Sequence, residues 1–151
     1  MTTITPKGTL YDTDYYRWVE ETLDRLRSRD YEAIDWENLI EEVTDLGISQ
    51  KQAIESLTTR LLEHFLKLAY WEAEREYNAR KWRSEIVNFR RQILKSLRKS
   101  PSLKPYLREN YPECLEDARK SMSELFDLPI EIPITLDQAL DEDWFPEIDS
   151  E

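Results

Sequence analysis

Apolar residues along most of this chain recur every three or four positions, the spacing that gathers them on one face of an α-helix. The first run predicts a helix over about residues 14–28, because Asp12 or Asp14 can cap its start. The second run predicts a helix that begins after Asp35 and ends at Gly47, a residue type suited to a left-handed helix end. The apolar positions of this second helix form one stripe: Trp36, Leu39, Ile40, Val43 and Leu46.

Two longer helices are predicted in the middle of the chain. Ser49 can cap a third helix that runs to about residue 76, and Asn78 offers a break before the fourth. The fourth helix covers about residues 80–99. It ends at Ser100-Pro101, because proline cannot continue a helix but suits the first position of a new one.

Shorter helices are predicted at 103–109, 113–126 and 135–140, with Pro112 opening the second and Thr135 capping the third. Strand-like alternation is confined to Ile130–Ile132, which flanking prolines disfavour as a strand. We therefore expect an all-α fold: a single-domain antiparallel helical bundle of four longer helices plus two or three short C-terminal helices. The domain should cover residues 10–146, between a flexible N-terminus (1–9) and an acidic C-terminal end (147–151).

Composition removes several classes of site. The 151 residues include 2 glycines, 1 histidine and 1 cysteine. Glycine-rich phosphate loops, paired-histidine metal sites, disulfides and cysteine-based clusters are therefore excluded within one chain. No cofactor or metal site is predicted. The chain also lacks a long apolar run and a secretory leader pattern, so we expect a protein of the cytoplasm with no membrane segment.

Charge is distributed unevenly along the chain, whose net charge is -11. Ten basic residues lie between Arg75 and Lys104, opposed by Glu76 and Glu85 alone, whereas 13 acids lie from Glu113 onward. The simplest interpretation of the basic face of helix 80–99 is a solvated surface. The alternative is a docking surface for the acidic tail, an acidic partner or nucleic acid.

Three polar positions stand out on the predicted helices. His64 points into an apolar stripe, which predicts a buried histidine held by a carboxylate or a carbonyl. As an alternative, it is a metal ligand or general base beside Glu41, Glu42 or Asp45. Arg83 and Arg90 flank another stripe, so we expect one of them to pair with a carboxylate from the second or third helix. The apolar tail residues Leu136, Leu140, Trp144 and Phe145 predict that the acidic C-terminus packs back onto the domain.

Five segments in order resemble a bacterial family known as domain of unknown function 29. They are Leu10–Trp18, Leu39–Gly47, Leu61–Lys67, Lys81–Leu103 and Leu140–Pro146. The resemblance implies an α-helical single-domain protein without an established activity, so no catalytic residue is carried over. It draws attention to a candidate polar cluster: Glu41, Glu42, His64, Lys67, Trp82, Arg83 and Arg90.

The sequence leaves three functions open. The first is a non-enzymatic helical protein that acts through protein–protein contacts with a protein partner or as a homo-oligomer. The second is binding of nucleic acid or an acidic partner through the basic helix 80–99. The third is a metal-dependent, hydrolase-like enzyme that uses Glu41, Glu42, Asp45 and His64.

Overall fold

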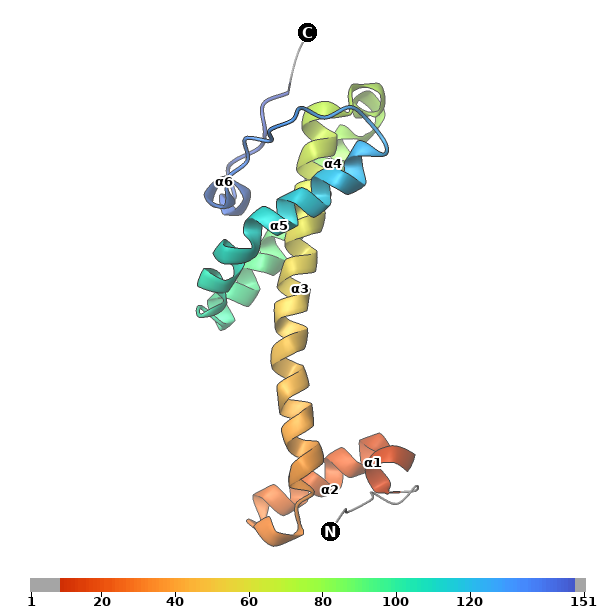
Figure 1. Ribbon diagram of the computed structural model, residues 1–151, viewed down its shortest axis with the longest axis vertical. Helices are drawn as coiled ribbons and strands as arrows, with labels where there is room; N and C mark the ends of the chain where they lie inside the picture. Colours follow the sequence, from red (N-terminus) through yellow and green to blue (C-terminus); the bar gives the residue numbers. More distant parts are fainter. Residues whose placement is uncertain (1–8, 149–151) are drawn as a thin grey trace. The chain divides into compact units, whose positions relative to one another are not determined.

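The computed structural model describes residues 9–148 (Figure 1), which contain six α-helices, one 3₁₀ helix and no strand. The all-α prediction is therefore confirmed. The helices are α1 (Leu10–Thr13), α2 (Tyr15–Arg27), the 3₁₀ helix η1 (Tyr31–Ala33), α3 (Trp36–Tyr70), α4 (Glu72–Lys99), α5 (Leu103–Ser123) and α6 (Leu136–Leu140). They fall into two compact units, one up to Ile48 and the other from Ser49 onward. No helix in the described part is both long and apolar enough to cross a membrane.

The N-terminal unit contains α1, α2, η1 and the first part of α3. Asp14 caps α2 as predicted, because its carboxylate accepts a hydrogen bond from the backbone N–H of Arg17 at 3.2 Å. Trp18 is buried on this helix, and its ring packs edge-on against Tyr11 with centroids 4.8 Å apart. The cap predicted at the start of α2 is therefore present, because it acts through a hydrogen bond between near neighbours.

The predicted break at Gly47 is wrong. Gly47 and Ser49 both lie inside α3, which continues without interruption to Tyr70. A glycine in a helix costs about 1 kcal/mol relative to alanine, which does not end a helix whose later turns are buried. Leu61, Leu62 and Phe65 supply that burial, since none of them is exposed to solvent.

The break predicted at Asn78 occurs seven residues earlier, at Trp71. Asn78 lies inside α4, where its side-chain amide donates to the carbonyl of Glu74 at 2.9 Å. Arg75 reaches back across the break and donates to the carbonyls of Leu68 and Ala69 at 2.9 and 2.7 Å. These carbonyls lie in the last turn of α3, so the arginine satisfies groups that the end of a helix leaves without partners.

The prediction of two helices separated at Pro112 is also wrong, because α5 runs through this proline. Proline removes one helical hydrogen bond and costs about 3 kcal/mol inside a helix. Buried neighbours on both sides offset that cost: Leu107, Tyr111 and Cys114 all face the core. The hydroxyl of Tyr111 also donates to the carbonyl of Ile134 at 2.6 Å, which ties α5 to the segment before α6.

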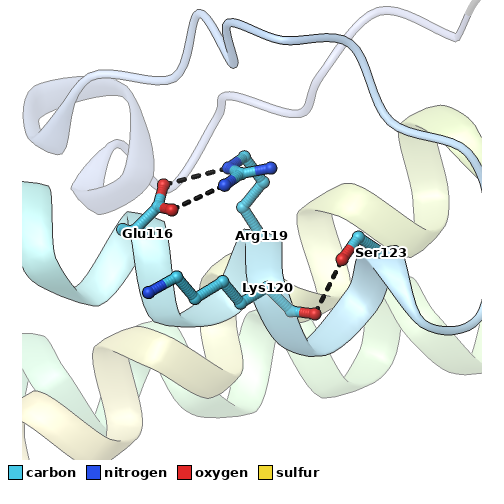
Figure 2. Close-up of polar contacts among 4 residues, drawn as sticks. All are labelled: Glu116, Arg119, Lys120 and Ser123. Carbon is cyan, nitrogen blue, oxygen red and sulfur yellow. Dashed lines mark hydrogen bonds and ion pairs between the residues drawn. The ribbon is translucent and has the colours of Figure 1, made fainter.

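The last turns of α5 are held by bonds within the helix (Figure 2). The guanidinium of Arg119 donates twice to the carboxylate of Glu116, at 2.9 and 2.6 Å, and this contact lowers the pKa of the Glu116 carboxyl. The hydroxyl of Ser123 donates to the carbonyl of Lys120 at 2.8 Å. Local bonds therefore end the helix without help from a glycine.

The prediction that the C-terminal segment packs onto the domain is confirmed. Thr135 caps α6 through a capping box with Gln138, and Leu136 is buried. Beyond α6, the ring of Trp144 packs edge-on against Phe65 of α3, with centroids 5.2 Å apart. The predicted flexible N-terminus lies almost wholly outside the described residues, as do the last three residues of the acidic end.

Candidate functional site

The seven candidate polar residues occupy several different settings. Glu41 and Glu42 belong to the N-terminal unit, whereas the other five belong to the second unit. Their roles in function stay predictions, but their surroundings are now defined. The main settings are the pair of His64 with Glu85, the buried Arg90, and Glu42 bound by two tyrosines.

His64 is buried and fully bonded, as the sequence predicted. Its Nδ1 lies 2.8 Å from the carbonyl oxygen of Arg60, and its Nε2 faces the carboxylate of Glu85 on α4. Each ring nitrogen therefore has an oxygen partner within the protein. Phe89 covers the ring with centroids 5.2 Å apart. Neither nitrogen of His64 is left for a metal ion or a substrate.

We expect the contact between His64 and Glu85 to contribute modestly to stability. The side chain of Glu85 is 35% exposed, so water can replace the lost partner in part. Replacing His64 with leucine should therefore lower the free energy of unfolding by about 1 kcal/mol. A double-mutant cycle with Glu85→Gln, followed by urea unfolding, measures the coupling. A loss above about 4 kcal/mol would instead indicate an uncompensated buried charge.

Arg90 is the most deeply buried charged residue in the described part, with 1% of its surface exposed. It makes three hydrogen bonds to backbone carbonyls of the C-terminal segment: Nε to Ala139 at 2.8 Å, one terminal nitrogen to Glu142 at 3.2 Å and the other to Trp144 at 2.8 Å. The predicted pairing of Arg90 with a carboxylate from the second or third helix is wrong. Burial lowers the pKa of the guanidinium, and the nearby carboxylates of residues 141–143 oppose that shift.

The neighbours of Arg90 explain why the C-terminal segment is held there. Its guanidinium lies over the rings of Phe65 and Phe145, 5.3 and 5.5 Å from their centroids. The guanidinium of Arg83 also lies over the ring of Phe145, 4.8 Å from its centroid, and Arg83 makes no ion pair in residues 9–148. Contacts between arginine and aromatic rings therefore hold the C-terminal segment, where we had expected the arginine to pair with a carboxylate.

Trp82 and Lys67 complete the candidate group in the second unit. Trp82 is buried, and its ring stacks on Trp71 with centroids 5.9 Å apart, as expected for a core residue. Trp71 in turn stacks on Phe126 at 5.0 Å. Lys67 is half-buried and makes no ion pair within the described residues.

Glu42 is held by two tyrosines in the N-terminal unit. The hydroxyls of Tyr11 and Tyr15 donate to its two carboxylate oxygens at 2.5 and 2.7 Å. These bonds lower the pKa of the Glu42 carboxyl and raise the pKa of both tyrosines. The carboxylate thus links α1 and α2 to α3 within this unit, while its neighbour Glu41 is exposed.

This arrangement predicts a pH dependence for the N-terminal unit. Because the pKa of Glu42 is lower in the folded state, its contribution to stability is present above the ordinary value of 4.5 and is lost as pH falls through the folded value. Replacing Tyr11 and Tyr15 with phenylalanine should raise the pKa of Glu42 toward 4.5. A carbon-13 NMR titration of the carboxyl group measures this shift. Tyr16→Phe is the control, since this exposed hydroxyl makes no bond to Glu42; an unchanged titration in the double variant would refute the assignment.

The metal-site hypothesis receives no support from the grouping of ligands. Among residues 9–148, no three histidine, cysteine, aspartate or glutamate side chains lie together as a metal ion would require. Glu42 is engaged by tyrosines and His64 by Glu85, and Asp45 is exposed. Carboxylates four residues apart on a helix are therefore a solvated face here.

A groove of about 620 Å³ lies between α4 and the segment after α6. Its lining combines basic residues of α4 with two acids of the C-terminal segment: Val87, Arg90, Arg91, Gln92, Lys95, Arg98, Glu142 and Asp143. Arg91, Lys95 and Arg98 are exposed and make no side-chain hydrogen bond or ion pair in the described part of the chain. The acidic tail thus approaches the basic helix without neutralising it.

The N-terminal unit exposes an unusual amount of apolar surface. Eleven large apolar or aromatic side chains between residues 15 and 48 are exposed: Tyr15, Tyr16, Val19, Leu23, Leu26, Tyr31, Trp36, Ile40, Val43, Leu46 and Ile48. The sequence predicted a buried stripe from Trp36 to Leu46, and the structure contradicts that burial for every member except Leu39. Periodicity identified the stripe, but could not show whether this chain covers it.

Comparison with known proteins identifies a family and nothing finer. A family model described as a domain of unknown function, DUF29, matches residues 10–145. The resemblance seen in the five sequence segments is thereby confirmed. No curated protein and no solved structure matches the chain.

Proposed function

We propose that this chain, which belongs to the DUF29 family over residues 10–145, is a non-enzymatic helical protein that works through contacts with another protein. One observation carries the proposal: the concentration of exposed apolar side chains in the N-terminal unit. Contiguous apolar surface on a folded protein marks an interaction site, because leaving it in water is unfavourable. The proposal does not depend on a catalytic group.

The exposed apolar residues follow helical spacing on two helices. On α2, Val19, Leu23 and Leu26 are separated by four and three residues. On the first part of α3, Ile40, Val43 and Leu46 are each separated by three residues, and all are at least 59% exposed. Each set forms one apolar band on its helix, as in helices that pack against a partner. We call the side of α3 formed by Ile40, Val43 and Leu46 the apolar face.

Acidic residues lie on the side of α3 that faces away from the apolar face. Glu37, Glu41 and Asp45 are four residues apart, so they form one exposed line along the same turns of α3. The segment up to Ile48 carries 12 acids and 5 bases. The net negative charge of this segment favours a protein partner that carries basic side chains.

The buried polar groups of the second unit support a role without catalysis. Both nitrogens of His64 and all three nitrogens of the Arg90 guanidinium are engaged within the chain. Cys114 is buried, and burial raises the pKa of its thiol, which disfavours the reactive thiolate. These groups stabilise the fold in the arrangement seen.

Site-specific photo-crosslinking in cells that carry the natural gene tests the proposal. A photoreactive phenylalanine analogue placed at Ile40 should give a discrete adduct whose partner is identified by mass spectrometry. The same analogue at Arg17 is the matched control, since this side chain is 67% exposed but lies across α2 from Val19. Equal labelling at both positions, or none at Ile40, would contradict the proposal.

The identified complex can then be measured with substitutions on the apolar face. Replacing Ile40 and Val43 with aspartate should weaken binding at least about tenfold, because burying a charge against an apolar partner is unfavourable. These side chains are 62% and 59% exposed, so the melting temperature should change little. Unchanged affinity would place the interaction elsewhere on the protein.

A further inference from the structure

We infer that the groove between α4 and the segment after α6 is a second protein-binding surface, which receives an acidic helical segment of another protein. This groove lies within the second unit, so it is separate from the apolar face of α3. Its main feature is a line of three exposed bases, Arg91, Lys95 and Arg98, which we call the basic stripe.

The basic stripe lies along one side of α4. Its members are separated by four and three residues, which places them on the same side of a helix. None of the three takes part in an ion pair within residues 9–148. From Tyr77 to Lys99, the helix contains a single acid, Glu85, which lies on another side and faces His64. The helix itself therefore supplies no acid to the stripe, in a chain whose net charge is -11.

Apolar side chains accompany the basic stripe. Val87 and Leu94 fall on the same side of α4, and Val87 lines the groove. Val87 is 42% exposed and Leu94 is half-buried. A partner that fits this surface therefore carries apolar groups beside its negative charges, because the contact then removes apolar surface from water on both sides.

The spacing of the bases suits a helical partner. Arg91 and Lys95 are about 6 Å apart along the axis of α4, and Lys95 and Arg98 are about 4.5 Å apart. A second helix whose carboxylates are separated by four and three residues presents them at the same rise, so each carboxylate can meet one base. The guanidinium groups of Arg91 and Arg98 can each hold a carboxylate through two parallel hydrogen bonds.

The groove suits nucleic acid less well than a protein segment. No aromatic side chain lines it, so unpaired bases have no ring on which to stack. Glu142 and Asp143 line the same groove and repel a phosphate backbone. The acidic remainder of the chain adds to this repulsion over the long footprint of a duplex, whereas a short protein segment contacts the stripe alone.

The two acids in the groove also restrict which acidic partners bind. Arg90 holds this segment beside α4 through the backbone carbonyls of Glu142 and Trp144. In the described part of the chain, neither Glu142 nor Asp143 forms an ion pair with the basic stripe. These carboxylates therefore reduce the positive potential of the groove without occupying its bases, so a partner needs apolar contacts as well as charge.

Fluorescence anisotropy with a synthetic helical peptide of about 20 residues tests the inference. The peptide carries glutamates separated by four and three residues, with leucines on the same side, and a matched peptide carries glutamines in their place. The full chain should bind the glutamate peptide at least about tenfold more tightly at low salt, and about 0.5 M salt should remove most of this difference. Equal affinity for the two peptides, or binding of neither, would overturn the inference.

Charge reversal tests where the peptide binds. One variant carries Arg91→Glu, Lys95→Glu and Arg98→Glu. The control changes the net charge equally at exposed positions that do not line the groove: Arg27→Glu, Lys81→Glu and Lys120→Glu. The first variant should bind the glutamate peptide at least about tenfold more weakly, whereas the control should lose much less affinity. Circular dichroism verifies that both are folded. Equal losses in the two variants would indicate general charge attraction and overturn the inference.

Two neutral substitutions test the role of the acids in the groove. Glu142→Gln with Asp143→Asn retains the backbone carbonyl that Arg90 binds, so the segment should stay in place. Affinity for the glutamate peptide should rise about threefold, because two nearby negative charges are removed. Glu124→Gln with Asp127→Asn is the control, since these acids do not line the groove. An unchanged affinity in the first pair would place the peptide elsewhere and overturn the inference.

Other occupants of the groove give different results. Duplex DNA or single-stranded RNA that binds the wild-type chain more tightly than the glutamate peptide, and loses affinity when the basic stripe is reversed, would assign the stripe to nucleic acid. Wild-type dimers that dissociate on the same reversal would assign it to a second copy of the chain. Either result would overturn the inference. Ile40→Asp with Val43→Asp changes the other unit and should leave peptide binding unchanged, so the proposed function and this inference are tested separately.

Discussion

Replacing Arg90 with methionine is expected to lower the free energy of unfolding by about 3–5 kcal/mol. The substitution keeps much of the side-chain volume but removes donors from three carbonyls, those of Ala139, Glu142 and Trp144. An unsatisfied buried carbonyl costs about 1–3 kcal/mol, and part of that cost is recovered where the segment can reach water. The contacts of the guanidinium with Phe65 and Phe145 are lost as well.

Urea unfolding of two further variants makes this prediction specific. Arg90→Lys keeps the positive charge but cannot donate in three fixed directions, so it should recover only a minor part of the loss. Arg98→Met removes an exposed arginine from the same helix and should change stability by less than about 0.5 kcal/mol. If Arg90→Met and Arg98→Met were equally stable, the clamp on the C-terminal segment would have no energetic role.

Ending the chain at Asp141 is expected to produce the second large loss, about 3–6 kcal/mol. The deletion removes Trp144 from its contact with Phe65, removes Phe145 from its contacts with Arg83 and Arg90, and removes the buried Pro146. It also leaves Arg90 with the carbonyl of Ala139 as its remaining partner of the three. The melting temperature measured by circular dichroism should fall by several degrees or more.

A chain that ends at Glu147 is the matched control for this deletion. It keeps Trp144, Phe145 and Pro146, so its melting temperature should equal that of the full chain. If the two shortened chains melted together, burial of the aromatic tail residues would contribute nothing. Ending the chain at Asp141 also removes Glu142 and Asp143 from the groove lined by Arg91, Lys95 and Arg98 of α4. Binding of an anionic polymer at low salt should therefore increase, provided that the shortened chain remains folded.

Two helix starts were predictable because their signals are local. Asp14 and Thr135 accept hydrogen bonds from backbone N–H groups three residues away. The sequence identified Thr135 and left Asp14 as one of two candidates, whereas the cap predicted at Ser49 lies inside α3. The burial of His64 was also predictable, since leucines three residues before and four residues after it define an apolar side of the helix. Its partner Glu85 was not predictable, because it comes from another helix whose packing no local pattern specifies.

Tertiary packing overruled local propensity at two positions. Gly47 and Pro112 each carry a helix-breaking tendency of about 1–3 kcal/mol, yet both lie inside helices. The burial of residues elsewhere in α3 and α5 outweighs these costs, and burial depends on neighbours distant in the sequence. Secondary-structure signals of this size therefore predict a boundary only where packing is neutral.

The sequence by itself determined the helical class, the family, the helix starts at Asp14 and Thr135 and the return of an apolar tail to the core. Only the tertiary structure decided what holds that tail. Every residue has a backbone carbonyl, so no sequence pattern marks those of Ala139, Glu142 and Trp144 as partners of Arg90. The exposure of Ile40 and Val43 has the same origin. Helical spacing determines which residues share a face, whereas coverage of that face depends on whether another segment packs there, and none of the described segments does so.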